Sequence, residues 1–200
     1  MKRNSIIKIT QLSILTAIVI IFQFLGQFIK IGTTSISLVL VPITLGAVLL
    51  GPAAGTFLGF VFGIMTLSAG ITGTDFFTYT LFTQQPIETA LICLSKGMLA
   101  GLAAGFIYKA LTKKGKHRVL AGFLASAATP IVNTGIFILG GLGLVSKTLT
   151  ENFTNGTTLI FFLVIGCAGI NFIAEFIVNI ILTPVINTLT NVLSKKIRKY

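Results

Sequence analysis

The chain has 200 residues, of which 54% are apolar and only 10% are charged, and its formal net charge is +11. Its mean hydropathy is +0.99. A soluble domain of this length would have too little polar surface to cover itself, so the composition excludes that class and favours an integral membrane protein.

The basic residues mark the ends of the apolar stretches. Of the 15 Lys and Arg residues, twelve fall into three clusters, at positions 2–8, 109–118 and 195–199. Short cytoplasmic loops collect Lys and Arg because these residues are unfavourable to translocate and face anionic lipid. The clusters therefore indicate topology and contact with a lipid membrane, with no nucleic-acid partner. They place both termini in the cytoplasm, which requires an even number of spans.

Six apolar stretches can supply these spans, since a helix that crosses about 30 Å of hydrocarbon needs about 20 apolar residues. In chain order they cover residues 5–29, 36–50, 53–69, 86–111, 119–145 and 158–189. The second stretch is short and carries Pro42, so we expect it to cross obliquely or to be irregular where protein covers it. The predicted fold class is an all-α integral membrane protein with six transmembrane helices in an N-in/C-in bundle, with residues 1–200 in a single membrane-embedded domain.

This topology places residues 70–85 and 146–157 on the outer face. The first of these segments is polar and aromatic, and it offers candidate lid residues: Asp75, Phe76, Phe77, Tyr79 and Phe82. Cys93 and Cys167 fall inside expected helices, where they are interpreted as small hydrophobic residues and not as a disulfide or metal site.

Glycines recur every four residues in the third and fourth expected spans. They are Gly51, Gly55, Gly59 and Gly63, followed by Gly97, Gly101 and Gly105. Small residues at this spacing let helices approach closely, and such packing is a principal source of association in lipid. We expect tight packing between these two spans, with docking of a separate membrane partner as the alternative role of one stripe.

Ionisable residues inside hydrocarbon are the main clue to function, because each costs roughly 3 kcal/mol at the bilayer centre. Lys96 and Glu175 are the two in question, and Asn133 and Asn171 lie at a depth comparable to that of Lys96. Two interpretations stay open. In one, Lys96 and Glu175 form a buried salt bridge. In the other, the fourth, fifth and sixth spans enclose a cavity that opens outward, and Lys96 binds an anionic or strongly polar solute.

Catalysis is poorly supported by the residues present. The chain has four carboxylates, too few for a multi-carboxylate metal site, and one histidine, His117, which lies among lysines. It also lacks the Gly-x4-Gly-Lys-Ser/Thr loop that binds ATP phosphates. We therefore predict that the chain is not an enzyme, with no catalytic residues, no metal and no cofactor.

The order and spacing of several segments resemble the substrate-binding S component of an energy-coupling factor (ECF) vitamin transporter. The segments are QLSILTA at 11–17, SLVLVPITLG at 37–46, LGPAAG at 50–55, LAGLAAGFIY at 99–108 and PIVNTGIF at 130–137. The likeness covers most of the chain, and within the family it is strongest to the pantothenate-specific branch.

The resemblance implies a binding protein of the bacterial cell membrane that captures a vitamin outside. It also implies partners, namely a transmembrane coupling subunit (T component) and two cytoplasmic ATPases. The family's Ala-x-x-x-Ala coupling motif corresponds to Ser13 and Ala17, with serine in place of the first alanine. A carboxylate substrate would suit Lys96, oriented by Glu175, and its hydroxyls and amide would suit three amide side chains, those of Asn133, Asn171 and Gln23.

Other functions stay open at this stage. Within the family, hydroxymethylpyrimidine and cobalamin are alternative substrates. Outside it, the chain could be a standalone small channel or secondary porter, or a small integral membrane enzyme.

Overall fold

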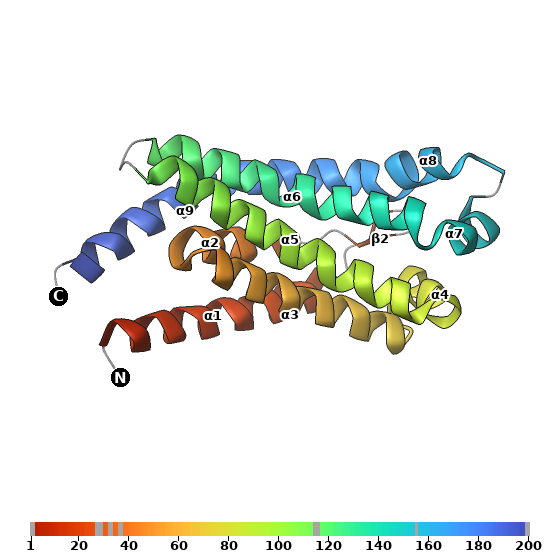
Figure 1. Ribbon diagram of the computed structural model, residues 1–200, viewed down its shortest axis with the longest axis horizontal. Coiled ribbons are helices and arrows are strands. Elements are labelled where there is room, and N and C mark those ends of the chain that lie inside the picture. The colour runs from red at the N-terminus through yellow and green to blue at the C-terminus, as the bar shows by residue number, and fades with distance from the viewer. Residues whose placement is uncertain are drawn as a thin grey trace.

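The computed structural model describes residues 3–26, 30–31, 34–35, 38–113, 117–154 and 156–198, which form a bundle of helices (Figure 1). Within this part of the chain, five helical stretches are long and apolar enough to cross a membrane. They are α1 (Arg3–Gly26), α3 (Pro52–Ile71), α5 (Pro86–Thr112), α6 (Arg118–Gly143) and a stretch made of α8 (Leu159–Phe161), η1 (Phe162–Gly169) and α9 (Ile170–Arg198).

The second expected span is only partly a helix. Strand β1 (Lys30–Ile31) pairs antiparallel with β2 (Thr34–Ser35), and helix α2 (Leu40–Leu50) follows. Its 11 residues cover about 16 Å, about half of a hydrocarbon core. Pro42 lies in the first turn, where a proline leaves the helix regular. Residues 27–29 of the first expected span and residues 36–37 of the second lie outside the described part of the chain.

Helix α2 is an interior element of the bundle. Leu40 and Ile43 are fully buried, in a cluster with Leu15 and Val19 of α1 and with Leu58 of α3. A helix that is apolar on every side is stable only where other helices surround it. The positions of α1, α3 and α2 are therefore set by one shared core.

The two ends of the bundle differ in character. The start of α1 and the end of α9 lie at one end of the bundle in Figure 1, together with the end of α5 and the start of α6. This end carries the basic clusters, of which Lys2, Lys114, Lys116 and Lys199 lie outside the described residues. The opposite end carries α4 (Phe76–Gln84) and α7 (Ser146–Phe153), two short helices within the expected outer loops (Figure 1). The arrangement is the one that an N-in/C-in topology requires, and the assignment of the basic end to the cytoplasm stays a prediction.

Helices α3 and α5 touch backbone to backbone, as the glycine spacing predicted. A Cβ atom added at Gly59 would collide with the carbonyl group of Gly97, and one added at Gly101 would collide with that of Gly55. Near the pocket end of the same contact, a Cβ at Gly63 would lie 2.6 Å from the carbonyl oxygen of Cys93. Backbone atoms cannot rotate away as a side chain does, so these positions require glycine.

The last expected span contains an irregularity that hydrophobic periodicity did not indicate. Its segment η1 is a π-helix of eight residues, inserted between α8 and α9. A π-helix adds residues to each turn, so it changes which side chains of the following helix face inward, and such segments are frequent at functional sites.

Gly59→Ala is expected to destabilise the protein by about 1–3 kcal/mol, because the added methyl group pushes α3 away from α5. The measurement is the thermal unfolding midpoint of the purified protein in detergent. Gly135→Ala in α6 is the matched control, since a Cβ there would meet nothing within 4 Å. Equal midpoints for the two variants would show that the α3–α5 contact is not as close as described.

Candidate functional site

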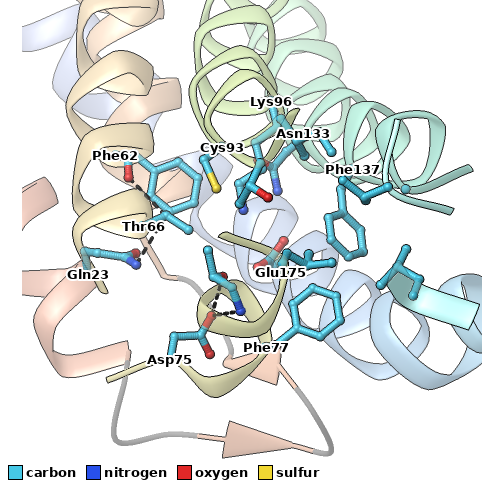
Figure 2. A pocket seen from close by; sticks show the side chains of 17 residues that line it. Gln23, Phe62, Thr66, Asp75, Phe77, Cys93, Lys96, Asn133, Phe137 and Glu175 are labelled. Carbon is cyan, nitrogen blue, oxygen red and sulfur yellow. Dashed lines mark hydrogen bonds between the residues drawn. The ribbon is translucent and has the colours of Figure 1, made fainter. Parts of the chain in front are cut away.

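A pocket lies between the helices at the end of the bundle where α4 and α7 are found (Figure 2). Its empty volume is about 790 Å³, which includes the open solvent at its mouth. Side chains from α1, α3, α4, α5, α6, α7 and α9 line it. Its ionisable or amide lining residues are Gln23, Asp75, Lys96, Asn133 and Glu175, with Cys93 beside them.

Lys96 is the basic side chain that lines this pocket in the described part of the chain. It lies on α5 and is half-buried, and its Nζ atom lies 5.2 Å from the centre of the buried Phe62 ring of α3. A cation over an aromatic face is stabilised by the negative face of the ring. The ring holds the ammonium group at the pocket wall without neutralising its charge, so the group is suited to binding an anion.

Asn133 of α6 offers a buried hydrogen-bond acceptor to the pocket. Its side chain is 7% exposed and lines the pocket, and its Oδ1 atom has no hydrogen-bond partner among the described residues. An unpaired buried polar atom costs about 1–3 kcal/mol, so such atoms are rare in folded proteins. This oxygen can accept a hydrogen bond from a bound molecule.

Helix α9 presents Asn171 and Glu175 on one face. Both are buried, and Glu175 lines the pocket together with Lys96. Asn171 does not line this pocket but a second cavity of about 430 Å³, open mouth included, which Lys96, Asn133 and Glu175 also line. Its Nδ2 atom donates to the Cys167 carbonyl oxygen at 3.3 Å. The pocket and the second cavity therefore adjoin along these three shared side chains.

Helix α1 contributes Gln23 to the site. It is buried and lines the pocket, and its Nε2 atom lies 3.5 Å from Thr66 Oγ1 on α3. The expected cavity between the fourth, fifth and sixth spans thus extends across the bundle to α1 and α3.

The five expected lid residues divide into two groups. Asp75 and Phe77 line the pocket, at the start of α4. Phe76 and Tyr79 are exposed and Phe82 is half-buried, and none of the three lines either cavity described above. One face of α4 therefore covers the pocket while the other faces away from it.

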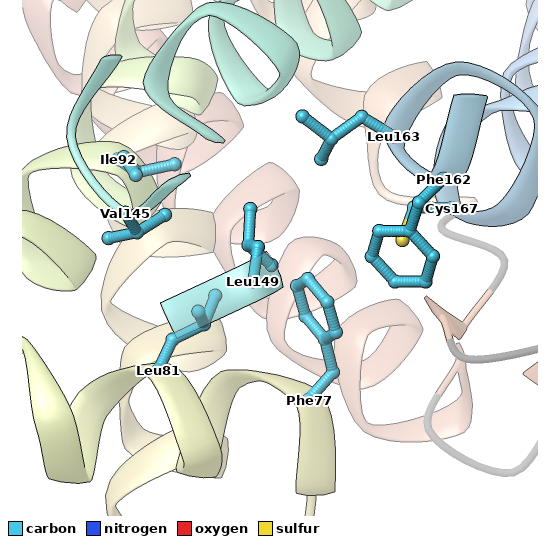
Figure 3. Packing of buried hydrophobic residues seen from close by; sticks show 8 residues of the cluster. All are labelled: Phe77, Leu81, Ile92, Val145, Leu149, Phe162, Leu163 and Cys167. Carbon is cyan, nitrogen blue, oxygen red and sulfur yellow. The ribbon is translucent and has the colours of Figure 1, made fainter. Parts of the chain in front are cut away.

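Helix α7 completes the cover, although the sequence predicted only a loop there. Phe153 at its end packs on Phe77 and Phe162 with ring centres 5.0 and 5.9 Å apart. Leu149 of α7 joins Phe77 and Phe162 in the apolar cluster drawn in Figure 3. Thr148 Oγ1 also donates to Gln85 Oε1 at 2.9 Å, which ties α7 to the start of α5.

Several of the residues that line the pocket were not predicted from the sequence. Some of these lie one helical turn from residues that were predicted. Ile92 and Cys93 precede Lys96 by one turn of α5, and Phe137 follows Asn133 by one turn of α6. Phe62 and Thr66 of α3 carry no such signal, because no residue of that helix was expected to face a ligand.

Ser13 and Ala17, the expected partner-docking residues, lie away from the pocket. Both are exposed on α1, one turn apart, and Ser13 Oγ donates to the Ile9 carbonyl oxygen at 3.0 Å. The hydroxyl is thus satisfied within its own helix, and the two positions form a small, flat exposed strip.

Two comparisons with known proteins agree with this architecture. The chain is 28% identical over 159 residues to the pantothenic acid transporter PanT of Lactococcus lactis subsp. cremoris (strain MG1363), a match that covers 70% of this chain and 78% of that protein. The family model for the substrate-specific component of ECF transporters matches residues 7–187. The chain is therefore a multi-pass membrane protein that belongs to the ECF transporter substrate-specific component family.

Proposed function

We propose that this protein is the S component of an ECF-type importer of the bacterial cell membrane and that it binds pantothenate at the outer face. In this proposal the chain is the non-catalytic subunit, and it delivers the vitamin to the cytoplasm with a coupling subunit and two ATPases. The basic end of the bundle faces the cytoplasm, and α4 and α7 face outward.

The proposal rests on one observation. The Lys96 side chain and the unsatisfied Oδ1 atom of Asn133 line the same pocket. Pantothenate has a carboxylate, a central amide and two hydroxyl groups. The carboxylate pairs with the Lys96 ammonium group, and the amide N–H or a hydroxyl donates to Asn133. Glu175 lines the same wall and orients Lys96.

Substrate size and charge favour pantothenate over the other vitamins considered. Hydroxymethylpyrimidine has no acidic group to pair with Lys96. Cobalamin is far larger than pantothenate, and a space of about 790 Å³ that includes the open mouth favours the smaller vitamin. The similarity to PanT of Lactococcus lactis supports the same choice.

The lid in this proposal consists of α4 and α7. Phe77 of α4 lines the pocket, and its ring packs on the ring of Phe153 of α7. This contact holds α4 over the bound vitamin. Release toward the outside requires these contacts to separate.

Lys96→Ala is expected to weaken pantothenate binding by about 2 kcal/mol, roughly 30-fold, because a buried carboxylate would lose its counter-charge. Calorimetry on the purified protein measures this change. Lys147→Ala is the matched control, since Lys147 is exposed on α7 and does not line the pocket. Unchanged affinity in Lys96→Ala would assign Lys96 to a structural role with Glu175.

Ser13→Leu and Ala17→Leu are expected to leave binding intact and to abolish ATP-dependent uptake, because a bulky group prevents close approach of a partner helix. Uptake is measured in vesicles that contain this chain with its coupling subunit and ATPases. Gly135→Leu in α6 serves as the control for adding a leucine to the bundle. Normal uptake by both α1 variants would show that this strip is not the docking surface, and uptake by this chain alone would contradict the coupled model.

Phe153→Ala is expected to raise the dissociation rate of pantothenate about tenfold, since aromatic pairs add about 0.5–1.5 kcal/mol beyond the burial of the ring. Stopped-flow measurement of release gives the rate directly. Phe161→Ala removes an exposed ring outside the cluster as the control. Equal release rates in the two variants would contradict a lid that includes α7.

A further inference from the structure

The ionisable groups of the pocket stand at two opposite sides. Figure 2 shows Lys96 on one side of the pocket and Asp75 on the other, with Phe62 and Phe137 flanking the space between. Glu175 of α9 also lines the pocket and is buried. Asp75 therefore adds a second, separate negative charge to a pocket that is proposed to bind an anion.

The Asp75 carboxylate is only half engaged by its own helix. Its Oδ2 atom accepts the backbone N–H of Thr78 at 3.2 Å and also the Thr78 hydroxyl, which caps the N-terminus of α4. Neither of these hydrogen bonds uses its Oδ1 atom. The cap fixes the side chain in place and leaves one charged oxygen to accept a hydrogen bond.

The chemistry of this oxygen restricts the ligand at that side of the pocket. A carboxylate oxygen repels a second acidic group, such as a phosphate, and accepts a hydrogen bond from a hydroxyl group. We propose that Asp75 is a specificity-determining residue that accepts a hydrogen bond from a hydroxyl group of the ligand, at the end opposite the carboxylate held by Lys96. The inference rests on the proposed function and assigns the orientation of the substrate: carboxylate toward α5, hydroxyl groups toward α4.

Asp75→Ser separates this role from helix capping. Serine caps helices as well as aspartate does, so α4 keeps its first turn. The variant loses the second oxygen and the negative charge. Loss of the charge alone would strengthen the binding of any anion, because a repulsion is removed. A weakening of binding that depends on the ligand's hydroxyl groups can therefore be assigned to the lost hydrogen bond.

The experiment is calorimetric titration of the purified chain with two ligands, pantothenate and N-(3,3-dimethylbutanoyl)-β-alanine, which keeps the carboxylate and amide and lacks both hydroxyl groups. We expect Asp75→Ser to bind pantothenate about tenfold more weakly than the unmodified protein does, since hydrogen bonds to charged groups are the strong ones. The analogue that lacks both hydroxyl groups is expected to bind the variant as tightly as the unmodified protein, or more tightly. Glu151→Gln removes an exposed carboxylate of α7 that does not line the pocket, and this variant controls for long-range charge effects.

Three other results would overturn the inference. An equal loss of affinity for both ligands would mean that Asp75 acts only by supporting the lid. Unchanged or tighter binding of pantothenate by Asp75→Ser would mean that no hydroxyl group reaches it. Failure of the unmodified protein to bind either ligand would overturn the proposed function itself, and the assignment of Asp75 with it.

Discussion

The contact between the backbones of α3 and α5 is the constraint on which the pocket depends. Gly63 lies against the carbonyl of Cys93, and Gly59 lies against that of Gly97. Phe62 precedes Gly63 in the chain and Lys96 precedes Gly97, so the glycine contacts set the separation of the aromatic ring from the ammonium group. A cation is thereby held at a defined place inside an apolar bundle by backbone atoms that have little freedom to move.

The polar face of α9 divides into a structural part and a part left for a ligand. Toward the basic end, Asn179 is paired with Thr44 of α2, whose hydroxyl also lies 2.7 Å from Thr129 Oγ1 of α6. These groups are fully buried and satisfy one another, which stabilises three helices in a medium without water. One turn nearer the end that carries α4 and α7, Glu175 and Asn133 line the pocket instead. At the level of Asn179 these polar groups are hydrogen-bonded to one another. At the level of the pocket, Asn133 Oδ1 has no partner among the described residues.

Local sequence patterns predicted the features that depend on short-range spacing. Hydropathy located the long helices, the glycine spacing predicted the α3–α5 contact, and burial cost singled out Lys96 and Glu175. The features that were missed depend on neighbours distant in the chain. Phe62 and Thr66, which no local pattern singled out, line the pocket because α3 packs against α5. The π-helix η1 leaves the apolar pattern unchanged, so hydropathy does not distinguish it from an α-helix.

The pocket beneath α4 and α7 is proposed to hold an acidic vitamin through Lys96. Native mass spectrometry of the protein purified from its own membrane tests this claim most directly, because it detects a retained small molecule without assuming its identity. We expect a bound species with the mass of pantothenate, which is lost when Lys96 is replaced by alanine and kept when Lys147 is replaced by alanine. A co-purifying molecule that has no acidic group, or one that both variants retain equally, would contradict it.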